Sequence, residues 1–305
     1  MHRTDAIATL KSGIRLEYVV AAPDDAKSVK ETLVLIHGYP QTCYAYRHVL
    51  EPLVHAGLRV VAPSYRGAGN SSADAQTGYD KFTLARDIHE LLTTTLALDS
   101  FVVLGHDIGS MVATAFAFLP EARKQLRGLI VCECPQPGTS LYRKSTTDPE
   151  MILGETFHFA FHQPRGFGEI LTEGREDVFL KHFYERLSYN PTFLSDGDLA
   201  YYISAFRRAG KMTAGFEVYR SFEQDHREML EAVKKQGKLP TSLPVLSTGG
   251  QESSFTKPLG EAMKELAENV TATGGIPHAG HWIAEENPHG FVKEVLGFLK
   301  EQQMV

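Results

Sequence analysis

Residues 101–119 read FVVLGHDIGSMVATAFAFL, and this stretch decides the fold. The apolar run Phe101–Leu104 predicts a buried strand, and Gly105 and Gly109 allow a sharp turn into the helix that follows. In this Gly-x-nucleophile-x-Gly pattern, the central side chain is exposed beside the helix N-terminus. That side chain is Asp107. The sequence therefore predicts a carboxylate nucleophile at the carboxyl end of a strand.

The identity of the central residue selects the chemistry. A serine must lose a proton before it attacks, and it acts on carbonyl carbons, whereas a carboxylate is already ionised at neutral pH. A carboxylate is suited to displacing a leaving group from saturated carbon, so the expected substrates are epoxides or alkyl halides. The product of attack is an ester on Asp107, which a water activated by a general base must hydrolyse. The alternative is a structural carboxylate that caps the helix at Gly109.

The general base is expected late in the chain, in the sequence HAGHW at residues 278–282. We prefer His281 to His278, because it follows a glycine and precedes Trp282, the single tryptophan of the chain. A histidine can take a proton from water near neutral pH and return it to the product. His281 is therefore the predicted base for ester hydrolysis.

An oxyanion hole is expected from the sequence HGYP at residues 37–40, which follows the apolar run TLVLI. Its turn can aim the backbone N–H of Tyr39 at the place where the N–H of Ile108 also points. Two such donors stabilise the oxyanion that forms when water attacks an ester.

The order of apolar runs and helical patterns indicates an α/β protein with a mostly parallel sheet. Continuous apolar runs mark strands that are buried on both faces. They occur at residues 32–36, 58–62, 101–104 and 129–132 and from residue 245. Apolar residues at helical spacing follow at 82–96 and 291–298.

The middle of the chain departs from this pattern. Residues 136–240 contain aromatic-rich helical stretches such as FHFAFHQP and DLAYYISAF and no clear buried strand. We interpret this segment as a helical cap that lies over the carboxyl ends of the strands. The core domain then consists of residues 1–135 and 241–305.

Composition excludes several classes of protein. The 305 residues include 43% hydrophobic and 22% charged residues, as expected for a soluble globular protein, and the net charge is −6. A nucleic-acid-binding surface needs a dense basic face, so no nucleic-acid partner is expected. No apolar run approaches the roughly 20 residues of a membrane span, and the first residues lack the apolar region of a signal peptide. We therefore expect no membrane partner and, if Met1 is the native start, a cytoplasmic location.

The three cysteines, Cys43, Cys132 and Cys134, are odd in number and have no paired spacing. This pattern predicts neither a disulfide framework nor a metal site, and we expect buried thiols and no cofactor. If residues 132–134 continue a strand, Cys132 and Cys134 point to one face and Glu133 to the other.

The ordered motifs HGYP, RGAGNS (66–71), GHDIG, a helical insertion and AGHW resemble the epoxide hydrolase branch of the α/β-hydrolase fold. The resemblance covers residues 14–299. In that family an acid orients the histidine, and two residues here match the family's acid positions. Glu252 stands where most members carry Asp, and Glu133 stands where a smaller group carries its acid. The resemblance also implies a cis peptide bond between Tyr39 and Pro40.

The resemblance implies two further catalytic side chains in the cap. Family members hydrogen-bond the epoxide oxygen with two cap side chains, usually tyrosines. Tyr219 in FEVYRSF matches the second position, and His158 in GETFHFAFHQP matches the first. Together with a glutamate after the strand at 129–132, this pair resembles the Cif-type epoxide hydrolases. On that ground we assign Glu133 rather than Glu252 as the orienting acid.

The resemblance has further implications for the pocket and the assembly. Phe157, Phe159 and Trp282 are expected in the pocket wall, and the group suggests small epoxides and a homodimer. Cif-type proteins are typically exported, whereas this sequence predicts no export signal.

Two other functions stay open. Haloalkane dehalogenases place Trp after the nucleophile, where this chain has Ile108, and haloacetate dehalogenases place arginines at the positions of Ile108 and Met111. The haloacetate enzymes bind halide with a histidine and a tyrosine that match His158 and Tyr219. The second alternative, after a dehalogenase, is a non-catalytic receptor for a small apolar ligand. The favoured prediction is an epoxide hydrolase that uses only water as co-substrate.

Overall fold

The computed structural model of the chain describes residues 1–74 and 78–305. It contains one eight-stranded sheet with the order β1-β2-β4-β3-β5-β6-β7-β8. The strands are β1 His2–Thr9, β2 Arg15–Ala22, β3 Glu31–Ile36, β4 Leu58–Pro63, β5 Phe101–His106, β6 Leu126–Cys132, β7 Val245–Thr248 and β8 Val270–Ala272. Strand β2 pairs antiparallel with β1 and β4, and the remaining pairs are parallel.

Helices flank the sheet, and we use the name cap for the helices of residues 140–236, which follow β6 and precede β7. The helices are α1 Leu50–His55, α2 Lys81–Glu90, α3 Ile108–Ala117, α4 Ser140–Thr147, α5 Pro149–Gly154, α6 Phe157–Phe161, α7 Phe167–Thr172, α8 Glu176–Leu187, α9 Asp196–Phe206, α10 Lys211–Arg220, α11 Phe222–Gln236, α12 Thr256–Met263, α13 Ile283–Glu286 and α14 Pro288–Glu301. Short 3₁₀ turns occupy Ala26–Ser28 and Cys43–Tyr46, and a π-helical turn at Leu91–Thr95 extends α2.

The central strands form because their side chains are buried on both faces. Every residue of β3 and β5 is buried, as their continuous apolar runs predict. The sequence did not predict β1 and β2, which lie at the antiparallel edge of the sheet. Most of β1 is exposed, so it lacks the continuous apolar run by which the other strands were found.

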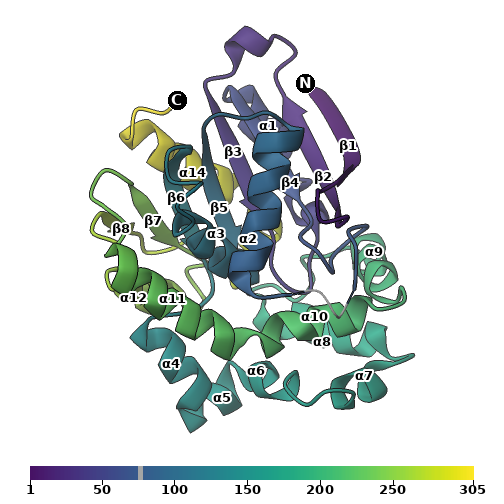
Figure 1. Cartoon of the computed structure of the whole chain (residues 1–305). Coiled ribbons are helices and arrows are strands. Elements are labelled where there is room, and N and C mark those ends of the chain that lie inside the picture. Colours follow the sequence, from purple (N-terminus) through teal and green to yellow (C-terminus); the bar gives the residue numbers. More distant parts are fainter. Residues whose placement is uncertain (75–77) are drawn as a thin grey trace.

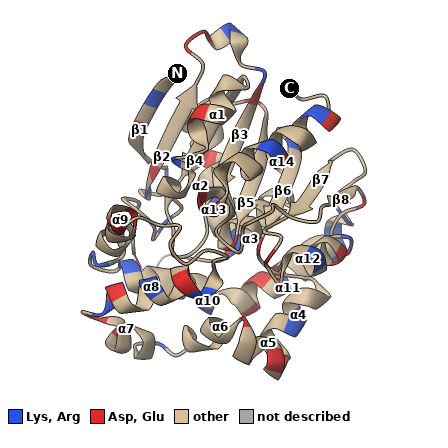
Figure 2. Ribbon diagram, turned by 180° about the vertical axis from the view of Figure 1, so that it is seen from behind, with Lys and Arg blue, Asp and Glu red and all other residues tan. Residues whose placement is uncertain are grey.

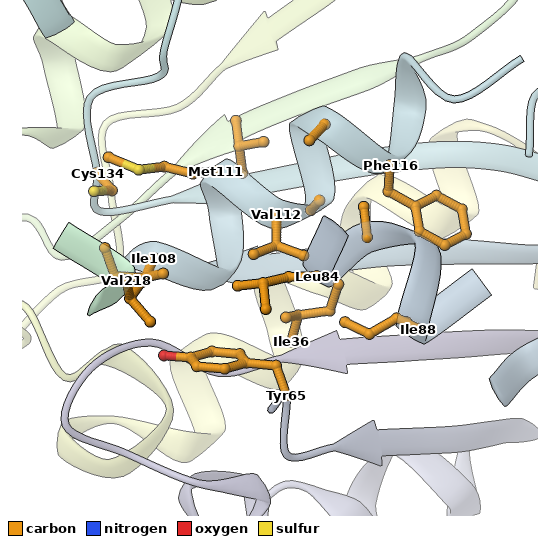
Figure 3. Close-up of a cluster of buried hydrophobic side chains, with 14 of the residues drawn as sticks. Ile36, Tyr65, Leu84, Ile88, Ile108, Met111, Val112, Phe116, Cys134 and Val218 are labelled. Atoms are coloured by element: carbon orange, nitrogen blue, oxygen red, sulfur yellow. The ribbon is translucent and has the colours of Figure 1, made fainter. Parts of the chain in front are cut away.

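Two apolar clusters cover the two faces of the sheet. Helices α2, α3 and α12 pack on one face (Figure 1), and α1, α13 and α14 pack on the other, which faces the viewer in Figure 2. Figure 3 shows the first face, where Val112 and Phe116 of α3 lie close to Leu84 and Ile88 of α2. Helix α3 is buried on all sides, and it therefore gives a rigid support to the turn that precedes it.

The helices α4 to α11 follow β6 and precede β7, and Figure 1 shows them gathered at one end of the sheet. Strands β6 and β7 are neighbours in the sheet, so the helical segment leaves and returns at the same place. The boundaries expected at residues 136 and 240 fall in the loops before α4 and after α11.

A buried ion pair joins the cap to the core. Lys81 Nζ lies 2.5 Å from Asp225 Oδ2 in α11, and both side chains are 1% exposed. The same ammonium group donates to the backbone carbonyl of Val218 in α10, at 2.7 Å. Because removal of one partner leaves an uncompensated buried charge, the pair ties these cap helices firmly to α2.

Two local expectations from the sequence meet different outcomes. The peptide bond between Tyr39 and Pro40 is cis, which confirms the expectation from the family. The expectation that Cys132 and Cys134 share a face is wrong. Strand β6 ends at Cys132, and Glu133 has a left-handed backbone with φ 68°, so the alternation stops there. Cys132 packs in the α1–α14 cluster, and Cys134 lies beside Met111 in the other (Figure 3).

The surface of the described chain carries mixed charge. Figure 2 shows basic and acidic positions interspersed over the core and cap helices. In the described residues, no helix combines the length and apolar character needed to cross a membrane.

Candidate active site

Asp107 occupies the turn between β5 and α3. Its backbone has φ 54° and ψ −126°, a conformation that is strained for a non-glycine residue. The turn is closed by two glycines: a Cβ at Gly105 would lie 2.1 Å from the carbonyl oxygen of Gly109, and one at Gly109 would lie 2.1 Å from that of Ile36. This turn presents the Asp107 carboxylate at the end of the strand that faces the cap.

Backbone N–H groups hold the Asp107 carboxylate. The N–H of Tyr39 donates to Oδ1 at 2.8 Å, and the N–H of Ile108 also bonds the carboxylate. Burial raises the pKa of Asp107, while the charge of His281 and the two N–H groups lower it in part, so the pKa lies above its ordinary value. A Cβ at Gly38 would lie 2.3 Å from the Asp107 Cβ, so the loop after β3 approaches closely only because it has glycine there.

His281 lies between two carboxylates. Its Nδ1 is 3.2 Å from Glu133 Oε2, and its Nε2 is 3.6 Å from Asp107 Oδ2. Burial lowers the pKa of His281, but the hydrogen bond to Glu133 and the charges of Asp107 and Glu133 outweigh burial and raise it above its ordinary value. His278, the other histidine of the motif, is exposed.

Glu133 is buried and fully occupied by donors. Its Oε1 accepts from the N–H of Gly250 at 2.6 Å and from the Thr256 hydroxyl at 3.2 Å, and its Oε2 accepts from the Ser253 hydroxyl at 2.7 Å. Glu252, in contrast, has an exposed side chain, and its backbone N–H bonds the carbonyl of Ala279. In the described chain, therefore, Glu133 rather than Glu252 contacts His281.

The sequence did not point to the donors that hold Glu133. Ser253 and Thr256 lie in the loop after β7 and at the start of α12, where a hydroxyl usually indicates a turn or a helix cap. Their proximity to Glu133 arises only because β6 and β7 end side by side in the sheet.

His158 and Tyr219 face Asp107 from the cap. They lie in α6 and α10, their ring centroids are 5.6 Å apart, and both line the cavity that contains Asp107 and His281. Burial, together with the charge of Arg186, lowers the pKa of His158 to about 3, and burial raises the pKa of Tyr219 well above its ordinary value. Both rings are therefore neutral at neutral pH, and each still carries a proton that it can donate.

The cavity has a volume of about 390 Å³ and a mixed wall. Its apolar members include Phe159, Phe183, Leu187 and Phe255, and its polar members include Glu155, Arg186, Ser188 and Glu252.

Phe159 lines the cavity as expected, but the structure differs for the two other predicted wall residues. Trp282 is 1% exposed, and its indole N–H donates to the carbonyl of Tyr184 behind the wall. Phe157 packs under the guanidinium of Arg186, at 5.1 Å. Phe183 takes a place in the wall that the sequence did not assign.

The three cysteines are buried and unpaired. Within residues 1–74 and 78–305, no group of three or more His, Cys, Asp or Glu side chains is arranged to hold a metal ion.

Comparison with known proteins defines the class of the chain. Residues 33–294 match the alpha/beta hydrolase family, and the chain belongs to that family. The predicted fold, a mostly parallel sheet with helices in an α/β-hydrolase arrangement, is confirmed.

Individual relatives point to one branch of the family. The chain is 31% identical over 291 residues to the soluble epoxide hydrolase of Corynebacterium sp. (strain C12), with 94% of each chain covered. The crystal structure of wild-type Cfl2 from Burkholderia cenocepacia matches with a TM-score of 0.87 and 30% identity, over 97% of this chain and 95% of that one. The structure of the epoxide hydrolase CorEH without ligand matches with a TM-score of 0.85 and 28% identity, over 98% and 99%. The resemblance to epoxide hydrolases is thus confirmed, and the closer likeness to Cif-type enzymes stays a prediction.

Proposed function

We propose that this protein is an epoxide hydrolase, a hydrolase acting on ether bonds, that converts small epoxides into vicinal diols through an ester on Asp107. The observation that carries the proposal is the position of Asp107. A carboxylate occupies the nucleophile turn of a hydrolase fold, with a His–Glu pair on one side and two neutral proton donors on the other. The names of the relatives agree with this activity.

In the first step, Asp107 Oδ2 attacks a ring carbon of the epoxide. Oδ1 accepts the N–H of Tyr39, and Oδ2 lies 3.6 Å from Nε2 of His281, so Oδ2 is the reacting atom. A bond forms between Oδ2 and carbon, and the carbon–oxygen bond of the ring breaks. The electron pair of that bond goes to the epoxide oxygen. Tyr219 and His158 donate hydrogen bonds to this oxygen, and one of the two side chains gives it a proton.

In the second step, His281 takes a proton from water, and the resulting hydroxide attacks Cγ of the ester. Negative charge then develops on Oδ1, which already accepts the N–H of Tyr39, and the N–H of Ile108 bonds the same carboxylate group. Collapse of this intermediate breaks the bond between Cγ and Oδ2, and Oδ2 leaves as the second diol oxygen with the proton that His281 took from water. The remaining proton of that water, now on the Asp107 carboxyl group, passes to the cap donor that protonated the epoxide oxygen, which restores Asp107 as a carboxylate. Glu133 keeps Nδ1 of His281 protonated, so that Nε2 is free to act as the base.

Esterification itself prepares His281 for this role. In the free enzyme, the charge of Asp107 raises the pKa of His281 and favours the imidazolium form. The ester carries no charge, so that contribution is lost when the substrate bonds to Asp107. His281 then releases its proton more readily and becomes the neutral base at the point in the cycle where a base is needed.

The dehalogenase alternative finds little support in the surroundings of the nucleophile. Ile108 and Met111 stand where arginines would hold a haloacetate carboxylate, and both are fully buried in the apolar cluster around α3 (Figure 3). Arg186 does line the cavity, but its guanidinium donates to the backbone carbonyls of Gly154 and Glu155. A substrate carboxylate beside Asp107 would therefore be costly to bury.

One turnover in ¹⁸O-labelled water tests the ester mechanism. With enzyme in excess over epoxide, water oxygen should enter the Asp107 carboxylate, because the diol receives its second oxygen from Oδ2. Mass spectrometry of the peptide that contains Asp107 measures the label. Label that appears in the diol alone would show direct attack of water on the epoxide.

A substrate panel tests the activity. Terminal epoxides, chloroacetate and an alkyl bromide are offered to the wild type, with Asp107→Ser as the control that lacks the carboxylate. Diol formation from epoxides supports the proposal, and halide release without diol would assign a dehalogenase. A ligand that raises the melting temperature without any turnover across the panel would favour the non-catalytic receptor.

A further inference from the structure

The carboxylate of Glu286 in α13 accepts four backbone hydrogen bonds. Its Oε2 accepts from the N–H groups of Tyr189 at 2.7 Å and Asn190 at 3.2 Å. Its Oε1 accepts from the N–H groups of Gly280 at 3.1 Å and Trp282 at 3.0 Å. The first pair belongs to the cap, and the second pair flanks His281.

These contacts join two segments that both border the cavity. We call residues 187–190 the cap segment and residues 280–282 the base loop. The N–H of His281 donates to the carbonyl of Leu187 at 2.8 Å, so three consecutive amides of the base loop are used at this junction. The approach is close, since a Cβ at Gly280 would lie 2.6 Å from the backbone nitrogen of Tyr189.

The backbone of His281 has one further contact that limits its position. Its carbonyl oxygen lies 2.7 Å from Nε2 of His106, the residue that precedes the nucleophile. Burial lowers the pKa of His106 well below its ordinary value, so this ring is neutral and places its proton on Nε2 for that carbonyl. The backbone carbonyl of His281 is thus held by His106 of the core. The N–H of His281 is held by Leu187 of the cap segment, and the N–H groups on either side of it are held by Glu286.

We propose that Glu286 is a positioning residue that holds the base loop and the cap segment in one arrangement, so that ester hydrolysis depends on a side chain outside the catalytic set. The inference rests on the proposed function. Glu286 touches neither Asp107 nor the ring of His281 in any hydrogen bond of the described chain, and it acts through the backbone on both sides.

The chemistry of a carboxylate suits this role. Two oxygens offer about four acceptor positions, which matches four N–H donors, whereas the amide of glutamine offers one acceptor oxygen and two donors. In Glu286→Gln, one of the two amide pairs therefore loses its acceptor and faces an NH₂ group. Burial raises the pKa of Glu286 while the backbone N–H groups of Asn190, Trp282, Gly280 and Tyr189 lower it, and the pKa lies above its ordinary value.

Glu286→Gln separates the two chemical steps. We expect ester formation at the wild-type rate and ester breakdown slowed about tenfold, because a small displacement of a catalytic group costs about one to two orders of magnitude in rate. When ester breakdown limits turnover, kcat and KM then fall together and kcat/KM stays near its wild-type value. Single-turnover mixing with mass spectrometry of the Asp107 ester measures both steps.

A second readout does not depend on turnover. The charge of Glu286 contributes to the raised pKa of His281, together with the charges of Glu133 and Asp107, while His106 and His158 also face that ring. Glu286→Gln should therefore lower the pKa of His281 in an NMR titration of its ring protons. If the wild type forms no ester, the proposed function fails and this titration still tests the position of Glu286.

The matched control is Glu265→Gln. Glu265 is exposed, and it accepts the N–H of Ser140 at 3.0 Å, so it also joins the core to the cap but away from the cavity. Both steps should stay at their wild-type rates in this control. The proposal is overturned if Glu286→Gln breaks down its ester normally, if both steps slow equally, or if the control behaves in the same way. Should Glu286→Gln not fold, Glu286→Asp, which keeps the charge but shortens the reach, is judged by the same criteria.

Discussion

The core half and the cap half of the site are held by different forces. In the core, directed hydrogen bonds hold Asp107, Glu133 and His281, at distances between 2.6 and 3.2 Å. In the cap, His158 and Tyr219 lie among aromatic rings, and Nδ1 of His158 has no hydrogen-bond partner in the described chain. A hydrogen bond holds one atom at a defined distance and angle, whereas packed rings are held by the shape of the space around them. The two halves should therefore respond differently to substitution.

The largest effect is expected in the core half. His281→Gln removes the proposed general base and should slow ester breakdown about 10²–10⁴-fold, while ester formation continues. Intact-protein mass spectrometry should then show an adduct of enzyme plus epoxide that persists for hours. Release of diol at the wild-type rate would show that His281 is not the base.

Glu133, the proposed orienting acid, is the next most sensitive position. Glu133→Gln should slow ester breakdown about 10²-fold, because it disturbs the tautomer and the orientation of His281. Glu252→Gln provides the matched control, since the Glu252 side chain is exposed and should leave the hydrolytic step unchanged. Rapid-quench measurement of ester decay separates the two variants. A larger loss in Glu252→Gln would reverse the assignment.

The cap half should give smaller effects on the opposite step. Tyr219→Phe and His158→Phe each remove one of the two proposed donors to the epoxide oxygen. Each should slow ester formation about tenfold with ester breakdown unchanged. The rate of ester appearance in a single turnover is the measurement. If either variant slows breakdown instead, the division of labour between cap and core does not hold.

The smallest effect is a shift in titration. In the wild type, the negative charge of Asp107 raises the pKa of His281. Asp107→Asn removes this charge. The pKa of His281 should therefore fall in the variant, as we propose it does in the ester. NMR titration of the ring protons gives the value, and an unchanged or higher pKa would contradict the proposed effect of Asp107.

Much of the core half could be predicted from the sequence because Asp107 and Glu133 directly follow buried strands and Tyr39 lies in the loop after another. Tyr39 follows β3, Asp107 follows β5 and Glu133 follows β6, and parallel strands bring such residues to one edge. The contact between Glu133 and His281 was expected only from the family resemblance. This contact depends on the left-handed backbone of Glu133. The same conformation interrupts the strand, so that Cys132 and Cys134 do not point to one face as expected.

The cap half could not be derived from local pattern in the same way. The helical character of residues 136–240 was visible, but the packing of short helices against each other is decided by shape over long sequence distances. Phe183 entered the cavity wall, whereas Phe157 packed under Arg186. His158 and Tyr219 were located through the family resemblance, and the four amides around Glu286 carried no sequence signal at all.

The adjacency of β6 and β7 has a consequence for synthesis of the chain. Asp107 and Glu133 leave the ribosome before the cap, and His281 leaves after it. Domains generally fold as units during synthesis, from the N-terminus onward. Here the sheet cannot gain β7 and β8 until every cap helix has been made, so a nascent chain contains Asp107 before it contains His281. On the mechanism proposed above, a fragment that ends before His281 could form the ester on Asp107 but could not hydrolyse it.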